Sequence, residues 1–125
     1  MAGTMDMSQL FLQAMEKYGE LVLVGSDKSE LLKKGVEMES LNCGDMSFQK
    51  LKEAALKSGI LLEADTKKKL VVVSVPVGAM KASQALLVAR LEDSRIDIAA
   101  YFKEGLIKQG GARQAIEYIS HQLQM

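Results

Sequence analysis

The sequence contains no tryptophan and only one cysteine, one proline and one histidine among 125 residues. The single cysteine, Cys43, cannot form an internal disulfide, which argues against a small secreted domain built on disulfides. A lone proline and a hydrophobic content of 48% exclude a proline-rich disordered chain. One cysteine and one histidine also fall short of the four nitrogen or sulfur ligands of a structural zinc site, so we expect no metal.

The sequence also lacks an excess of charge and a long apolar run. Sixteen Lys and Arg residues balance sixteen Asp and Glu residues, so no overall field attracts the chain to nucleic acid or to an anionic membrane. The longest apolar run, LVVVSVPVGAM, is much shorter than the about 20 residues of a membrane span, and MAGTMDMSQLF lacks the features of a secretion signal. Together with the short length, these absences predict one cytoplasmic (or nuclear) domain over residues 1–125, without contact to a membrane.

The first third of the chain begins with a helical pattern. Apolar residues recur at helical spacing over residues 6–18, and Asp6 with Gln9 has the spacing of a capping box at the start of that helix. The apolar run LVLV at 21–24 predicts a short strand, and GSDKSELLKKG predicts a second, short helix. These elements are expected to precede a longer helix.

A third helix and a hairpin follow. The helix is expected from about Ser47 to Ser58, because Phe48 and Leu51 begin an apolar face and a glycine follows its end. The runs ILLEA and LVVVSV, joined by the polar turn DTKKK, predict a hairpin from Ile60 to Val75.

The rest of the chain carries helical patterns only. Wide apolar faces run from Ala79 onward, so residues 79–124 are expected to form a helical extension. The last helix has a narrow apolar stripe that includes Ile116, Ile119 and Leu123, and this stripe must bury against the domain or against another copy. These three residues are therefore the candidate interface with a protein partner or within a homo-oligomer.

The order helix, short strand, helix, helix, hairpin over residues 6–76 is that of a winged-helix domain. The segments KYGELVLVGSDKSELLKKG, MSFQKLKEAALKSG and ILLEADTKKKLVVVSV resemble the LOTUS (OST-HTH) group of such domains. The resemblance implies an RNA-binding or protein-binding module of ribonucleoprotein regulation. The expected fold class is thus α+β, winged-helix-like with a C-terminal helical extension. One alternative stays open: if VEMESLNCGDM forms a strand, the chain becomes a small mixed α/β sheet.

Five lysines make up the candidate nucleic-acid surface. Lys50 and Lys57 lie on the outward face of the third predicted helix, and Lys67, Lys68 and Lys69 occupy the tip of the hairpin. Lysine contacts to phosphates are independent of sequence and sensitive to salt. A lysine triplet at a hairpin tip is also an ordinary protection against edge pairing, and we prefer this second interpretation.

A second candidate site is the predicted helix start after PVGAMKAS. Gly78, Lys81 and Ser83, with the free amides of a helix start, are placed to hold an anionic ligand or a nucleotide. Only a fragment of the GxxxxGK[ST] spacing of a phosphate-binding loop is present. We expect no catalytic residue and no cofactor, because Cys43 and His121 are far apart in sequence and no motif surrounds either.

Two hypotheses about function follow. The first is a non-enzymatic interaction or regulatory module that binds protein or RNA and self-associates through its C-terminal helices. The alternative is a small α/β domain that binds an anionic ligand or nucleotide at the Gly78 helix start.

Overall fold

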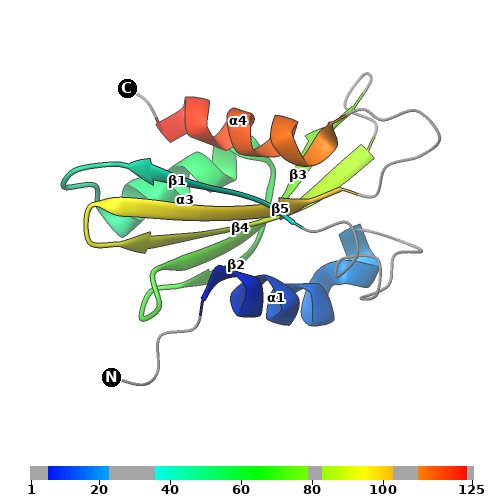
Figure 1. Ribbon diagram of the computed structural model, residues 1–125, viewed down its shortest axis with the longest axis horizontal. Coiled ribbons are helices and arrows are strands. Elements are labelled where there is room, and N and C mark those ends of the chain that lie inside the picture. Colours follow the sequence, from blue (N-terminus) through cyan, green and yellow to red (C-terminus); the bar gives the residue numbers. More distant parts are fainter. Residues whose placement is uncertain (1–5, 23–35, 79–82, 103–109, 124–125) are drawn as a thin grey trace.

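The computed structural model of the chain describes residues 6–22, 36–78, 83–102 and 110–123. Within these ranges an antiparallel five-stranded sheet carries helices on both of its faces (Figure 1). In chain order the elements are α1 (Met7–Val22), β1 (Glu37–Asn42), α3 (Phe48–Ser58), β2 (Ile60–Asp65), β3 (Leu70–Val77), β4 (Ser83–Glu92), β5 (Arg95–Tyr101) and α4 (Gly111–Leu123).

The strand order across the sheet is β1-β5-β4-β3-β2, and every neighbouring pair is antiparallel. Strands β2 to β5 form a continuous meander, which short turns can connect because each strand reverses the direction of the one before. Strand β1 lies at the far side of this meander and pairs with β5. Strands β1 and β2 are therefore the two edges of the sheet.

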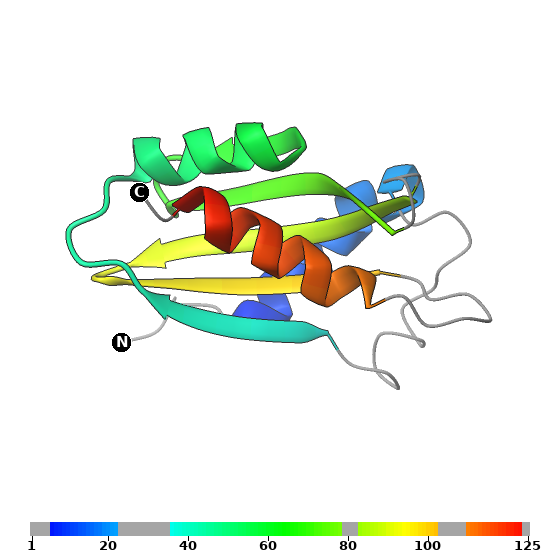
Figure 2. The same ribbon diagram turned by 90° about the horizontal axis from the view of Figure 1, so that it is seen from above.

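The sheet separates two apolar clusters. Helices α3 and α4 lie side by side on one face (Figure 2), and α1 covers the other face (Figure 1). Strand β3 shows the alternation that supplies both clusters, since Val71 and Val73 face α3 and α4, whereas Leu70 and Val72 face α1. None of the helices in the described ranges has the length and apolar character needed to cross a membrane.

The winged-helix prediction is wrong. The segments expected to continue a helical extension after Ala79 form β4 and β5 instead, and only α4 of that extension is helical in the described residues. The strand allowed by the alternative at VEMESLNCGDM is present as β1, but the sheet it joins is antiparallel and five-stranded. Residues 23–24 of the expected LVLV strand and the second predicted helix lie outside the described residues, and Leu21 and Val22 belong to α1.

The error over β4 has a physical cause. Residues Ala85 to Ala89 are all fully buried, because β4 lies in the middle of the sheet and helices cover both of its faces. A strand in that position shows an uninterrupted apolar run rather than an alternation, and periodicity alone does not separate such a run from a buried helix.

Candidate functional site

The candidate site is the outer edge of β2 together with the flank of α3 beside it. Among the described residues β2 pairs only with β3, so the backbone groups on its other side have no partner in the sheet. Two large apolar side chains are exposed here: Leu56 in the last turns of α3 is 54% exposed, and Ile60 at the start of β2 is 64% exposed. An unpaired strand edge is a template for pairing with another chain, and apolar side chains beside it favour such a contact.

Leu56 and Ile60 lie on opposite faces of this edge. Ile60 pairs with Ser74, a residue of the β3 face that is turned toward α1. Leu56 belongs to α3, on the other face. Lys50 of α3 lines a cleft with residues of α4, which marks the side of α3 that faces α4. Leu56 is six residues further along α3, so its side chain is turned about 120° around the helix axis from that side. Leu56 is therefore on the flank of α3 that points away from α4.

A polar contact holds the second half of β2 in place. The Tyr18 hydroxyl of α1 donates a 2.7 Å hydrogen bond to Glu63 Oε1, and Lys17 Nζ lies 3.2 Å from the same oxygen. The hydrogen bond to Glu63, burial and the nearby carboxylate charge together raise the pKa of Tyr18. The ladder shifts by one residue between Leu61 and Glu63, which is a β-bulge. The apolar part of the strand is thus its first half, ILL, in which Ile60 is exposed and Leu61 and Leu62 are half-buried.

The opposite edge, β1, has a different character. Arg113 of α4 donates hydrogen bonds to Glu39 and, at 3.0 Å, to Glu37. The hydrogen bonds to Glu39 and Glu37 raise the pKa of Arg113. Met38 is 43% exposed on this edge, but charged side chains lie on both sides of it in sequence. Charge on an edge strand opposes pairing with another chain, so β1 is the better protected of the two edges.

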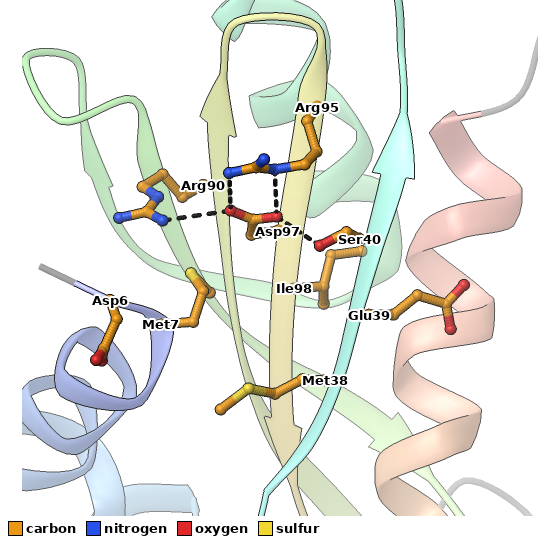
Figure 3. Close-up of a pocket in the computed structure, with 9 residues that line it drawn as sticks. All are labelled: Asp6, Met7, Met38, Glu39, Ser40, Arg90, Arg95, Asp97 and Ile98. Atoms are coloured by element: carbon orange, nitrogen blue, oxygen red, sulfur yellow. Dashed lines mark hydrogen bonds and ion pairs between the residues drawn. The ribbon is translucent and has the colours of Figure 1, made fainter. Parts of the chain in front are cut away.

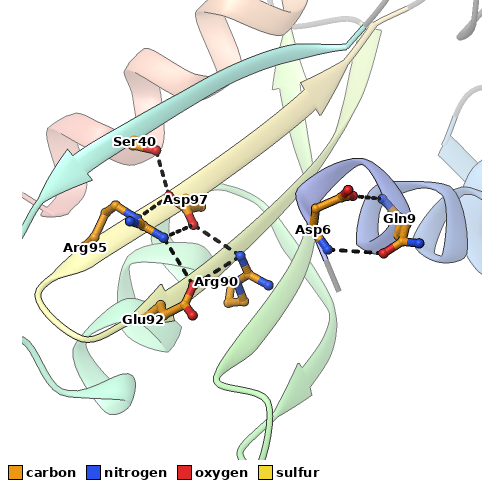
Figure 4. Close-up of polar contacts among 7 residues, drawn as sticks. All are labelled: Asp6, Gln9, Ser40, Arg90, Glu92, Arg95 and Asp97. Carbon is orange, nitrogen blue, oxygen red and sulfur yellow. Dashed lines mark hydrogen bonds and ion pairs between the residues drawn. The ribbon is translucent and has the colours of Figure 1, made fainter. Parts of the chain in front are cut away.

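A cleft of about 450 Å³ lies on the α1 face, beside the start of α1 and the strands β1, β4 and β5 (Figure 3). Its polar centre is Asp97, whose side chain is buried. Ser40 Oγ donates to Asp97 Oδ1 at 2.7 Å, Arg95 Nε donates to the same oxygen at 2.8 Å, and an Arg90 nitrogen lies 3.3 Å from Oδ2. Glu92 accepts a 3.2 Å hydrogen bond from Arg95 and forms an ion pair with Arg90 at 3.3 Å (Figure 4).

The Asp97 network is structural in character. Burial alone raises the pKa of Asp97, but the hydrogen bonds from Ser40, Arg95 and Arg90 together outweigh it, and the pKa lies below its ordinary value. A carboxylate that is ionised at neutral pH and has both oxygens engaged is a poor proton donor and a poor base. The network instead links β1, β4 and β5 beside the start of α1, where Asp6 and Gln9 form the expected capping box (Figure 4).

The five candidate lysines lie on two elements, α3 and the turn between β2 and β3. Lys57 is exposed near the end of α3, whereas Lys50 is half-buried and lines the cleft beside α4. The segment 67–69 is exposed in the turn between β2 and β3. Several carboxylates lie at the same end of the sheet as this turn: Asp65, Glu92 and Asp93. Arg90 and Arg95 lie at this end as well, so the lysines of the turn are among side chains of both signs.

The candidate anion site does not form as expected. Gly78 follows the end of β3, its backbone N–H donates a 3.1 Å hydrogen bond to Gln114 Oε1, and Ser83 begins strand β4 instead of a helix. Lys81 lies outside the described residues. The backbone amide of Gly78, which was expected to face a ligand, thus donates to a side chain of the same chain. A strand begins where the site required the start of a helix.

The candidate interface on the last helix is occupied within the chain. Ile116 and Ile119 are fully buried and Leu123 is nearly so, in the cluster between α3, α4 and the sheet. The narrow stripe therefore has its partner surface in the same domain. Among the described residues, no group of three or more His, Cys, Asp or Glu side chains is arranged to hold a metal ion.

Sequence analysis missed Leu56 and Ile60, although a signal for Leu56 exists. Leu56 falls outside the apolar face of α3 that Leu51, Ala54 and Ala55 form, and a large apolar residue off the buried face of a helix indicates exposure. Comparison of the chain with protein-family models, curated proteins and solved structures found no match. The site must therefore be interpreted from its own geometry.

Proposed function

We propose that the chain is a non-enzymatic interaction module that binds a protein partner edge-on at β2. The observation that carries this proposal is the exposure of Leu56 and Ile60 on the two sides of one unpaired strand edge. A partner that docked on a single face of the sheet would cover one of these side chains. A partner strand that adds to β2 contacts both, while its main chain takes up the unpaired backbone groups.

The chemistry of this edge favours protein over RNA as the partner. Nucleic-acid surfaces need cations for the phosphates and exposed aromatic rings for the bases. The first half of β2 offers aliphatic side chains, and the lysines of the adjoining turn follow Asp65 at the far end of the strand. Aliphatic side chains beside a strand edge match an extended polypeptide with apolar residues at alternate positions.

A site-specific photo-cross-linker tests the proposal. A photoreactive phenylalanine analogue is placed at position 60 on the β2 edge or at position 38 on the β1 edge, and the covalent products formed in cells are identified by mass spectrometry. The affinity of each purified partner is then measured for the wild type, Ile60→Lys and Met38→Lys. We expect products from position 60 only, and at least a tenfold weaker affinity for Ile60→Lys alone.

The Met38→Lys variant is a matched control, because it places the same charge at an exposed apolar position on the opposite edge. Equal cross-linking from both positions, or a partner that binds Ile60→Lys as tightly as the wild type, would remove β2 as the binding edge.

A further inference from the structure

Building on the proposed function, we infer that the partner at this edge is a second copy of the same chain. The two β2 strands pair antiparallel around a two-fold axis at Leu61. This pairing joins two sheets into one of ten strands, five from each copy.

The charge of the chain permits this assembly. The formal net charge is zero at pH 7, so two copies approach without overall repulsion. The first half of β2 carries no ionised side chain, and the nearest one on the strand, Glu63, is engaged by Tyr18 and Lys17 of α1. This part of the edge therefore offers no charged side chain that a partner of opposite charge could bind. An apolar edge is complementary to another apolar edge, and the chain supplies one in itself.

The directions of the side chains select the register. In an antiparallel pair, residues opposite each other lie on the same face of the sheet. Ile60 and Leu62 both belong to the α1 face, whereas Leu61 packs on the face of α3 and α4. Pairing around Leu61 sets Ile60 opposite Leu62 and each Leu61 opposite the other, so apolar side chains meet on both faces.

Registers shifted toward Glu63 are worse. The bulge turns both Leu62 and Glu63 toward α1. A two-fold axis at Leu62 would therefore set Glu63, on the α1 face, opposite Leu61, on the face of α3 and α4. An axis at Glu63 would set two carboxylates against each other, which is unfavourable across strands. With the axis at Leu61, Glu63 lies opposite Gly59, and no like charges meet.

The same axis explains the exposure of Leu56. A two-fold axis perpendicular to the sheet keeps both α3 helices on one face, so the α3 flank of each copy, with its Leu56, faces the flank of the other. The two Ile60 side chains are covered on the opposite face. Two partly exposed apolar side chains per copy make a small interface, and we therefore expect a weak dimer, with a dissociation constant on the order of 10–100 µM.

Sedimentation velocity of the full chain, from about 1 µM to about 500 µM, measures this equilibrium. We expect the wild type and Met38→Lys to shift from monomer to dimer over this range, and Ile60→Lys to dimerise at least tenfold more weakly. A chain that is monomeric at every concentration, or a dimer that Ile60→Lys leaves unchanged, overturns the inference. A monomeric chain that still binds another partner in an Ile60-dependent manner overturns the self-association only and leaves the proposed function intact.

Disulfide trapping tests the axis itself. In a Cys43→Ser background, which removes the one native thiol, Leu61→Cys places two thiols at the axis, within the distance a disulfide spans. We expect oxidation to produce covalent dimers of Leu61→Cys but not of Ala64→Cys on the same strand. Covalent dimers from Ala64→Cys, or none from Leu61→Cys, overturn the proposed register.

Leu61 is half-buried, so a second pair of variants guards against misfolding. Mixing chains that carry Ile60→Cys with chains that carry Leu62→Cys is expected to give mixed disulfide dimers, because these positions lie opposite each other. If the mixture gives no more covalent dimer than each variant alone, the register is overturned as well.

Discussion

Replacing Asp97 with asparagine tests the most closely connected polar cluster of the fold. Asp97 is only 7% exposed and its carboxylate accepts from Ser40, Arg95 and Arg90, which ties β1, β4 and β5 together. The asparagine side chain keeps the size and one acceptor but removes the charge. Arg90, whose side chain is also largely buried, then loses its ion pair with Asp97 and keeps the one with Glu92.

We expect Asp97→Asn to lower the free energy of unfolding by about 2–3 kcal/mol at pH 7. Removing one member of a buried ion pair costs about 3–5 kcal/mol when the other charge is left without a partner. The loss is smaller here because Glu92 stays within 3.3 Å of Arg90, and because Arg95 is half-exposed and can be solvated. Charge-assisted hydrogen bonds of about 1.5–3 kcal/mol are consistent with this range.

The loss should depend on pH in a defined direction. The pKa of Asp97 is lowered in the folded chain, so its stabilising contribution is fully present above the unfolded value of about 3.9 and disappears as the pH falls toward the folded value. The difference between wild type and Asp97→Asn should therefore be constant from about pH 7 to pH 5. It should narrow as the pH falls below the unfolded value, because the carboxyl of the unfolded chain binds a proton there before the folded one does.

Urea unfolding followed by circular dichroism at several pH values measures this difference. Asp45→Asn is the control, because it makes the same chemical change at an exposed loop position and should alter stability by less than about 0.5 kcal/mol. A difference below about 1 kcal/mol at pH 7, or one that does not narrow in acid, would refute the role given to Asp97.

Three further predictions concern other parts of the structure. Tyr18→Phe removes the hydrogen bond to Glu63 and should cost about 1 kcal/mol in urea unfolding; an unchanged midpoint would contradict that contact. Gly59→Ala should cost at least about 1–3 kcal/mol, since the new Cβ would lie 2.1 Å from the backbone oxygen of Ser74, and a neutral effect on thermal unfolding would argue against this close approach. Replacing all three lysines of 67–69 with alanine should not change the binding of the chain to immobilised single-stranded RNA at about 0.15 M salt, which we expect to be weak in the wild type. If the wild type binds in a salt-sensitive manner and the variant does not, the result would instead support RNA binding.

Several local elements could be predicted because their signals lie within a few residues. Asp6 and Gln9 form the expected capping box, and Ser47 caps α3 by accepting a hydrogen bond from the Lys50 amide. The runs from Ile60 to Val75 do pair as a hairpin, β2 and β3, but this hairpin lies within the five-stranded sheet and is not a wing. In each case the side chain or turn that defines the element contacts its own neighbours in sequence.

The rest depended on contacts between distant segments. Ala85 to Ala89 suggested a helix because both faces of β4 are buried, and only the placement of α1, α3 and α4 explains that burial. The position of Ile60 on an edge is likewise decided by the pairing of β1 with β5, which leaves one side of β2 unpaired within the described part of the chain. The candidate site could not be predicted from sequence, because strand order determines which apolar residues remain exposed.

Hydrogen–deuterium exchange at two protein concentrations tests the central claim most directly. Amides in a peptide spanning residues 59–65 should exchange more slowly at about 500 µM than at about 1 µM, because a second β2 protects the edge, whereas amides of residues 37–42 should exchange equally at both. Slower exchange confined to residues 37–42, or no dependence on concentration in either strand, would contradict the account of β2 as the interaction edge.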